Sequence, residues 1–152
     1  MLAGRPTPAS VTDSTMNWLR DIEALRQLPQ RYARAIDARD IDAVAQLFDP
    51  DGSVDGLRGQ AAVPAYLDGL RAMPQTGSTM HVLGDPLIEL DEGAGEAHLD
   101  TYAIVYQLRP AESPEPDGML GMRYLDDVVR VGAAWLIHHR RSVLLWSRPL
   151  SR

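Results

Sequence analysis

The chain has 152 residues, of which 45% are hydrophobic and 24% charged, as expected for one globular domain that can bury a core. Its formal net charge of −6 argues against binding to a nucleic-acid backbone, which needs a basic face. There is no cysteine, which excludes disulfides, a thiolate nucleophile and cysteine-based metal centres.

The N-terminal segment is rich in Pro, Ser and Thr and has no apolar leader, so it does not resemble a secretory signal. We expect residues 1–15 to form a flexible arm and residues 16–148 to form a single domain. No apolar run is long enough to cross a membrane, and we expect a cytoplasmic protein.

A first helix is predicted over residues 14–27, capped by Ser14 or Thr15. Its apolar positions recur at helical spacing: Trp18, Ile22, Leu25 and Leu28. Pro29 should kink the helix or restart it, because proline disrupts a helix interior. The helix then continues to about residue 38.

Two shorter helices follow. Asp40 is a natural N-cap for a helix over residues 41–48, and the sequence "DPDG" should end that helix with a turn. A short strand is possible at "SVDG". A third helix is predicted over residues 60–74, with Pro64 in its first turn or kinking it.

The rest of the chain favours strands. Residues 79–91 suggest a strand with a bulge or bend at Gly-Asp-Pro, and "DEGAGE" a hairpin turn. Residues 97–109 are rich in aromatic and β-branched side chains, and residues 122–131 and 134–146 form a closing hairpin around Gly132. Helices followed by an antiparallel sheet predict an α+β fold.

Asp37 raises a question, because a carboxylate in the last turn of a helix faces the negative end of the helix dipole. It lies at the flank of the apolar stripe and could point to solvent or into a cavity under the helix. Tyr32 lies within the stripe, either as a core tyrosine or as a hydrogen-bond donor to a substrate oxygen.

Histidines are the other candidates. His81 lies at the start of the first long strand, and a carboxylate such as Asp37 beside it would set its tautomer and raise its basicity. His138 and His139 are adjacent on a strand and point to opposite sides, so they cannot chelate one metal together. We expect neither a metal nor a cofactor. There is no nucleotide-binding motif, and without a G-x-S-x-G sequence no serine nucleophile is suggested.

Residues 98–106 place a polar set on one face of a strand, spaced two apart. The set is His98, Asp100, Tyr102, Ile104 and Tyr106. This face is either exposed to solvent or the wall of a polar cavity, and the pattern alone does not decide between them.

The segments "DIEALRQLPQRYARAIDARDIDAVAQLFDPDGSVD", "GQAAVPAYLDGL", "MHVLGDPLIELD" and "AWLIHHRRSVLLW" together resemble SnoaL-like domains of the nuclear transport factor 2-like superfamily. The resemblance covers about residues 18–146. It implies a cone-shaped α+β barrel, in which three N-terminal helices pack within a curved, mostly antiparallel sheet around a pocket. The fold hosts many activities.

Within the superfamily the sequence is most similar to the cofactor-free lyases, namely scytalone dehydratase, bile acid 7α-dehydratase and the lindane dehydrochlorinase. Asp37 and His81 match their Asp–His dyad, and Tyr32 matches the tyrosine of the bile acid dehydratase. A further polar residue on the following strand has no clean match, so Asp100, Thr101 or Tyr102 could take its place.

Ketosteroid isomerases share the "QRY…D…LF" pattern, and Tyr32 matches their oxyanion-hole tyrosine. Their catalytic Asp would fall near Asp55 or Gly56, and a glycine cannot act as a base. That departure argues against an isomerase of this type.

We therefore expect a lyase or isomerase that acts on an apolar cyclic or polycyclic molecule. Asp37, His81 and Tyr32 are the predicted catalytic residues. The predicted substrate-binding residues are Trp18, Phe48, Tyr66, Asp100 and Tyr102. The alternatives are a polyketide cyclase-type enzyme and a non-catalytic binding or assembly module. The resemblance also implies a homodimer or homotrimer, with the apolar "SVLLW" strand either at an interface or in the core.

Overall fold

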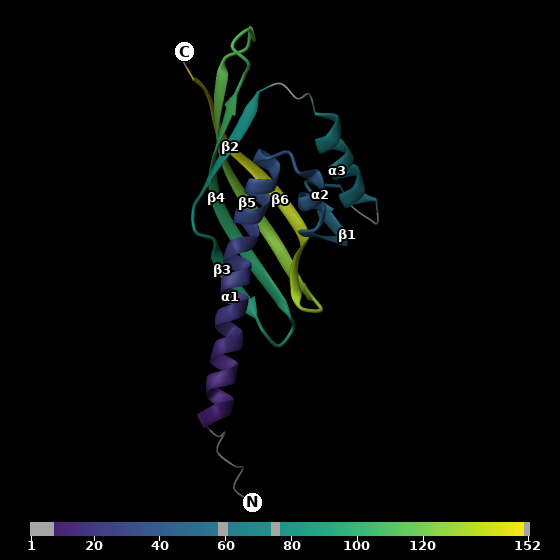
Figure 1. Ribbon diagram of the computed structural model, residues 1–152, viewed down its shortest axis with the longest axis vertical. Coiled ribbons are helices and arrows are strands. Elements are labelled where there is room, and N and C mark those ends of the chain that lie inside the picture. The colour runs from purple at the N-terminus through teal and green to yellow at the C-terminus, as the bar shows by residue number, and fades with distance from the viewer. Residues whose placement is uncertain (1–7, 58–60, 74–76, 151–152) are drawn as a thin grey trace, which may run out of the picture.

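The computed structural model describes residues 8–57, 61–73 and 77–150. Its helices are α1 (Pro8–Asp37), α2 (Ile41–Ala45) and α3 (Ala62–Ala72). Its strands are β1 (Phe48–Val54), β2 (Ser78–Leu83), β3 (Leu87–Asp91), β4 (Glu96–Leu108), β5 (Asp117–Val131) and β6 (Ala134–Leu150). Helices packed against one sheet (Figure 1) confirm the predicted α+β class.

The sheet has the strand order β1-β6-β5-β4-β2, and β3 also pairs with β4. Only β1 and β6 run parallel among the described strand pairs, so the sheet is mostly antiparallel, as predicted. The single bent strand expected over residues 79–91 is two separate strands, β2 and β3. Both pair with the same edge of β4, one after the other. The backbone N–H of Gly84 still donates to the carbonyl of Tyr102 (2.8 Å) before the chain leaves the ladder at Pro86, which has no N–H to donate.

Helix α1 begins earlier than the sequence predicted and passes Pro29 without a break. The Pro29 ring is fully buried, and this packing offsets the missing backbone hydrogen bond. The C-terminal part of α1 lies across the sheet, whereas residues 12–20 are exposed. In Figure 1 this N-terminal end projects beyond the strands.

The region between α1 and α3 also differs from the prediction. Asp40 caps α2 as predicted, its side chain accepting a hydrogen bond from the N–H of Ala43 (2.9 Å). The helix then ends at Ala45, because the chain joins the sheet at Phe48 to pair with β6. The "DPDG" turn lies inside β1, where the register against β6 shifts.

Some predictions fall on residues that the structure does not describe. These are the first part of the expected arm, residues 1–7, and the two ends of the third predicted helix. Within the described part, α3 spans Ala62–Ala72, and Pro64 lies in its first turn, as predicted.

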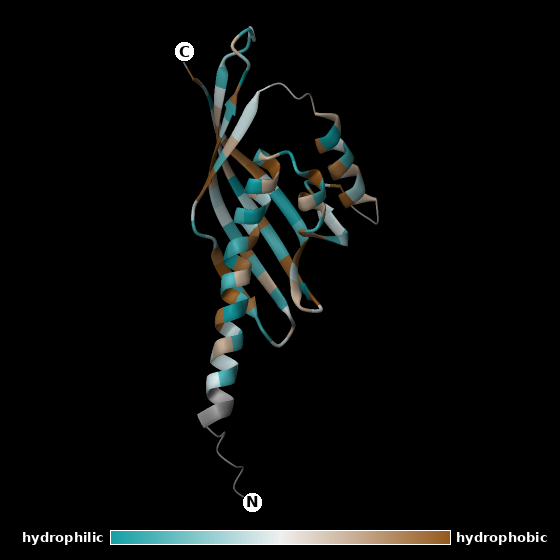
Figure 2. Ribbon diagram, in the orientation of Figure 1, coloured by the Kyte–Doolittle hydropathy of each residue, from teal (hydrophilic) through white to brown (hydrophobic). Residues whose placement is uncertain are grey.

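The two faces of the sheet have different environments. The inner face packs against the helices and includes the buried side chains of β4, such as Leu99, Thr101, Ala103 and Val105. The outer face carries the alternate residues, and brown and teal positions alternate along the strands in Figure 2. The main core joins α1, α2, α3 and the sheet, through side chains that include Leu25, Leu28, Val44, Leu67, Leu99 and Ile137.

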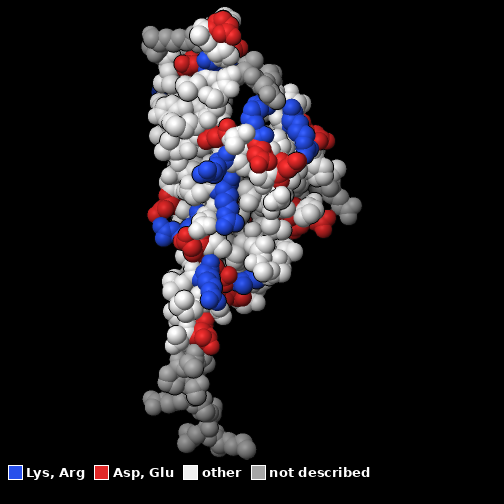
Figure 3. All heavy atoms as spheres, viewed as in Figure 1, with Lys and Arg blue, Asp and Glu red and all other residues white. Residues whose placement is uncertain are grey.

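The surface is charged with both signs. Figure 3 shows arginines and carboxylates along α1 on the viewed face. The end of β6 is apolar and exposed at Leu144, Leu145 and Trp146, so these side chains of the predicted "SVLLW" strand are not part of the core of one chain. In the part of the chain that the structure describes, no helix combines the length and the apolar character needed to cross a bilayer.

Candidate active site

Asp37 and His81 meet where the end of α1 packs against β2. Asp37 is the last residue of α1, and its Oδ1 accepts a hydrogen bond from Nδ1 of His81 at 2.6 Å. The same oxygen accepts from the hydroxyl of Thr79 (2.8 Å), and Oδ2 accepts from the backbone N–H of His81 (2.9 Å). Three donors therefore stabilise a carboxylate that the helix dipole alone would disfavour.

The alternation of β2 directs His81 inward. His81 pairs with Val105 of β4, a buried inner-face residue, and opposite residues in a ladder share a face. Its neighbours Met80 and Val82 are exposed on the outer face. Ala33, one turn before Asp37 on α1, is small and buried, as close packing of the helix on β2 requires.

The dyad is largely shielded from solvent. The side chain of His81 is 7% exposed and that of Asp37 25%. Because an ionised carboxylate only accepts hydrogen bonds, the hydrogen of this bond is carried by Nδ1 of His81, and in a neutral ring this leaves the lone pair on Nε2. This is the arrangement in which an imidazole can accept a proton while the carboxylate stabilises the resulting imidazolium.

Two openings border the dyad: Asp37 lines both, and His81 is among the lining residues of the second. An apolar cavity of about 270 Å³ lies between the ends of α1 and α3 and the paired ends of β2 and β4, and both Asp37 and Thr79 line it. A wider groove of about 680 Å³ runs along α1, and both Asp37 and His81 line it. The other residues of that groove come from α1 and from Ala38 just after it, and most are polar, among them Gln27, Arg31 and Arg34.

Tyr32 lies deeper in the inner core. Its hydroxyl is 2.5 Å from the hydroxyl of Tyr66 on α3, and its ring makes edge contacts with Phe48 and Tyr124. Three of the predicted residues, Tyr32, Phe48 and Tyr66, therefore lie together. Among the residues that the structure describes, none of these three lines either opening to the dyad.

Arg140 and Asp126 complete this cluster, and sequence reasoning missed both. Nε and Nη2 of Arg140 donate to the two oxygens of Asp126 at 2.6 and 2.7 Å, and both side chains are fully buried. The Arg140 guanidinium stacks 3.9 Å above the Tyr32 ring, and its Nη1 has no partner among the described residues. One feature of the sequence could have pointed to this pair. Asp126 is a charged residue at a position of β5 where the alternation places inward-facing, mostly apolar side chains.

Burial and charge shift the ionisation of these groups. Burial opposes the charge of Arg140, but the charge and hydrogen bonds of Asp126 outweigh it and hold the pKa of Arg140 above its ordinary value. Burial, followed by interaction with Tyr32, raises the pKa of Tyr66, and burial likewise raises that of Tyr124. Both phenols therefore stay neutral hydrogen-bond donors.

The structure does not bring the remaining predicted residues to the dyad. Trp18 is exposed on the projecting part of α1. Asp100 and Tyr102 lie on the outer face, where Asp100 pairs with Arg123 and the Arg123 guanidinium covers the Tyr102 ring. The period of two along β4 is the physical reason, since buried Thr101 faces inward and its neighbours must face outward.

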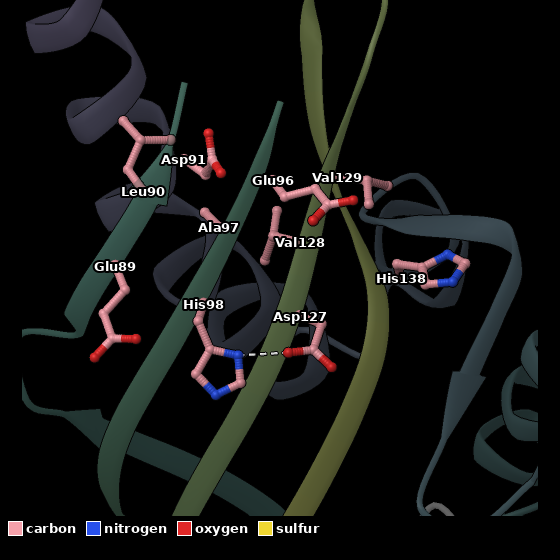
Figure 4. Close-up of a pocket in the computed structure, with 10 residues that line it drawn as sticks. All are labelled: Glu89, Leu90, Asp91, Glu96, Ala97, His98, Asp127, Val128, Val129 and His138. Atoms are coloured by element: carbon pink, nitrogen blue, oxygen red, sulfur yellow. Dashed lines mark hydrogen bonds and ion pairs between the residues drawn. The ribbon is translucent and has the colours of Figure 1, made fainter. Parts of the chain in front are cut away.

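A second His–Asp pair lies on that outer face. Nδ1 of His98 donates to Oδ1 of Asp127, and Figure 4 shows the pair on neighbouring strands with Glu89 on the other side of His98. The pair borders an open hollow of about 540 Å³. Both side chains are about half exposed, at 50% and 52%.

Known proteins share this architecture. The SnoaL-like domain family matches residues 17–141. A solved structure from Novosphingobium aromaticivorans DSM 12444, provisionally described as a scytalone dehydratase, is 22% identical with a TM-score of 0.76, and the match covers 91% of this chain and 93% of that one. No curated protein matches the chain.

Two further solved structures agree. Hexachlorocyclohexane dehydrochlorinase LinA-type3 from Novosphingobium barchaimii LL02 is 15% identical, with a TM-score of 0.75 and coverage of 90% and 94%. An NTF2-like protein with a cystatin-like fold, from Novosphingobium aromaticivorans, is 24% identical, with a TM-score of 0.72 and coverage of 93% and 92%. At these identities the likeness establishes the fold, and it confirms the predicted cone-shaped α+β architecture.

Proposed function

This chain belongs to the SnoaL-like domain family, and from that premise we propose that it is a cofactor-free lyase or isomerase acting on an apolar cyclic or polycyclic small molecule. The observation that carries the proposal is the shielded Asp37–His81 pair, with its 2.6 Å hydrogen bond. Asp37 lines an apolar cavity, and both residues line the groove along α1. The names of two structural neighbours, a dehydratase and a dehydrochlorinase, refer to elimination reactions. This likeness supports a lyase as the reaction class.

In the proposed reaction, His81 acts as the general base. Its Nε2 accepts a proton from a carbon next to a carbonyl or another activating group, and the electron pair of the broken C–H bond forms a new C=C bond. In a lyase the group on the neighbouring carbon leaves with the electrons of its own bond. In an isomerase the imidazolium returns the proton to a different carbon.

Asp37 positions His81. Its hydrogen bond keeps Nδ1 protonated and Nε2 free, and its charge stabilises the imidazolium while the proton resides there. Thr79 and the backbone N–H of His81 hold the carboxylate in turn, so the geometry exists before a substrate arrives.

Tyr32 is proposed to donate a hydrogen bond to the developing oxyanion or to a leaving hydroxyl. The Arg140 guanidinium over its ring supports this role, because a nearby cation makes a phenol a better donor. For Tyr32 to reach a substrate, its bond to Tyr66 must open or the pair must act together. Asp37 lies five residues further along α1, which is about 7.5 Å of helix rise.

The test uses 2-tetralone, an apolar cyclic ketone with acidic α-hydrogens, in D2O. Proton NMR follows the exchange of deuterium into the α-carbon. His81→Ala should lower the exchange rate by about 10²–10⁴-fold, the usual size of general-base catalysis. His98→Ala removes the outer-face histidine and should leave the rate unchanged. An exchange rate in His81→Ala equal to that of the wild type would overturn the mechanism.

A non-catalytic binding or assembly module is the second candidate. It is favoured by the inner core, where Tyr32, Phe48, Tyr66 and Tyr124 fill the space with the chain's own side chains. If the wild-type protein shows no exchange with 2-tetralone and no elimination from cyclic β-hydroxy ketones, this candidate replaces the lyase. A polyketide cyclase-type enzyme would use the same base but would form a carbon–carbon bond, which product analysis by mass spectrometry distinguishes.

A further inference from the structure

The apolar cavity beside the dyad carries two arginines as well as a carboxylate. The charged residues of its lining are Asp37, Arg39 and Arg109. Asp37 is the one acid in this described lining, and its oxygens already accept three hydrogen bonds. The formal charges in the lining therefore leave an excess of one positive charge in a chain whose net charge is −6.

Arg109 follows the end of β4 and is held by its backbone and by one ion pair of its side chain. Its N–H donates to the carboxylate of Asp117 at 2.7 Å, which fixes the start of the loop. One guanidinium nitrogen, Nη2, lies 3.2 Å from the largely exposed Glu115. Nε is buried and has no hydrogen-bond partner among the described residues. A buried N–H that lacks an acceptor is costly, and a ligand oxygen would satisfy it.

Arg39 is positioned by the turn that follows the end of α1. Its backbone adopts a φ of 55°, and its N–H donates to the carbonyl of Ile36 at 2.9 Å, which turns the chain at the end of α1. Its Nη2 donates to the carbonyl of Met73 at 2.9 Å, so the guanidinium spans the gap to the end of α3. A guanidinium has five N–H donors, and this contact uses one of them.

We propose that this cavity binds an apolar ring compound that carries a carboxylate, with the carboxylate held by Arg39 and Arg109. The ring lies against Ile36, Ile41, Leu70 and Leu108, which supply apolar walls. Guanidinium groups suit this task, because their planar arrangement of N–H donors matches the two oxygens of a carboxylate. The resulting charge-assisted hydrogen bonds are stronger in a partly enclosed site than in open water. All fifteen basic residues of the chain are arginines.

The arrangement also orients the ligand. The negative charge of Asp37 repels a carboxylate, so the anionic group is held at the arginines and the uncharged ring lies on the side of Asp37. This inference rests on the proposed function for the identity of the reacting end, because the part of the ring nearest to Asp37 must extend past it to reach His81, which lines the groove along α1. Binding itself requires no turnover and can be measured separately.

The experiment compares 2-naphthoate with 2-naphthamide, which has the same ring and no charge, by isothermal titration calorimetry at pH 7. The wild-type protein should bind 2-naphthoate at least tenfold more tightly than 2-naphthamide. Arg109→Gln and Arg39→Gln should each weaken 2-naphthoate about tenfold and leave 2-naphthamide unchanged. Arg148→Gln is the matched control, because Arg148 lies on β6 and its Nη1 donates to the backbone carbonyl of Ser147.

Equal affinity of the wild type for the two compounds, or no binding of 2-naphthoate, overturns the proposal even if no variant folds. An equal loss in Arg148→Gln also overturns it, because that result means non-specific attraction to charge. His81→Ala separates this proposal from the proposed function. Retained 2-naphthoate binding in that variant, whatever its exchange activity with 2-tetralone, shows that anion recognition stands without the base.

Discussion

The Asp37–His81 and His98–Asp127 pairs contain the same two side chains but lie on opposite faces of the sheet. The inner pair is shielded, with His81 only 7% exposed, and Asp37 accepts two further hydrogen bonds, from Thr79 and from the backbone. The outer pair is about half exposed, with 50% and 52% exposure, and borders an open hollow (Figure 4).

This difference shows that a hydrogen bond to aspartate is not sufficient to make a histidine an effective general base. Water screens the outer pair and competes for both partners, so its interaction is weak. The inner pair has less water around it, and its carboxylate is held by groups that do not move with the substrate. Those conditions let the carboxylate orient the ring and stabilise its charged form.

The largest expected effect comes from exchanging the carboxylates of the two pairs for amides. Asp37→Asn should lower the rate of 2-tetralone exchange by about 10²–10⁴-fold, because an amide no longer fixes the tautomer of His81 or stabilises its charge. Asp127→Asn should change the rate less than about twofold. Proton NMR measures both rates, and thermal melts check that each variant is folded. A similar loss in both variants would contradict the distinction.

The ion pairs of the two faces allow a second contrast, in stability. Asp126→Asn leaves the fully buried Arg140 without its counter-charge and should cost about 3–5 kcal/mol of unfolding free energy. Asp100→Asn breaks the partly exposed pair with Arg123 and should cost about 0–1 kcal/mol. Urea denaturation measures both values. If Asp126→Asn costs no more than Asp100→Asn, the Asp126–Arg140 pair is hydrated in solution.

Removing a tyrosine hydroxyl from each face compares the two faces again, with smaller expected changes in stability. Tyr66→Phe removes the partner of the Tyr32 hydroxyl in the core and should lower stability by about 0.5–1.5 kcal/mol. Tyr102→Phe, on the outer face, should stay within about 0.5 kcal/mol of the wild type. Urea denaturation again provides the comparison, and equal effects would mean that the Tyr32–Tyr66 bond contributes nothing net.

The smallest effect is a pH dependence on the outer face. The hydrogen bonds from Arg123 hold the pKa of Asp100 below its ordinary value. A carboxyl whose folded-state pKa is lowered stabilises the protein above its unfolded-state pKa of about 3.9, and this stabilisation is lost as the pH falls toward the folded-state value. Asp100→Asn should therefore reduce the loss of stability between about pH 4 and pH 2. Urea melts across that range test it, and an unchanged slope would contradict it.

Local sequence signals predicted much of the fold. The helix-to-strand order, the Asp40 cap and the Gly132 turn follow from local chemistry, and the structure has them. The start of α1, its passage through Pro29 and the entry of Phe48 into β1 were missed. In each case contacts distant in sequence override a local preference, since burial compensates for a proline and a parallel neighbour supplies strand hydrogen bonds.

The same division applies to the candidate site. The position of Asp37 at a helix end, and its unfavourable charge there, can be read from the sequence, and so can the period of two along β2 and β4. Which face of β4 meets the helices cannot be read from it, because the polar face with His98, Asp100 and Tyr102 fits either solvent or the wall of a polar cavity. Only the tertiary structure turns Thr101 inward and Asp100 toward solvent.

The sequence by itself determined the residue types, their spacing and the order of elements, because these depend on neighbours along the chain. The tertiary structure decided which charges lose their water. It buried Arg140 with Asp126 under Tyr32, and it placed Arg39 and Arg109 around one cavity from distant parts of the chain. Desolvation depends on everything packed around a group, and the packing between segments far apart in sequence exists only in the folded chain.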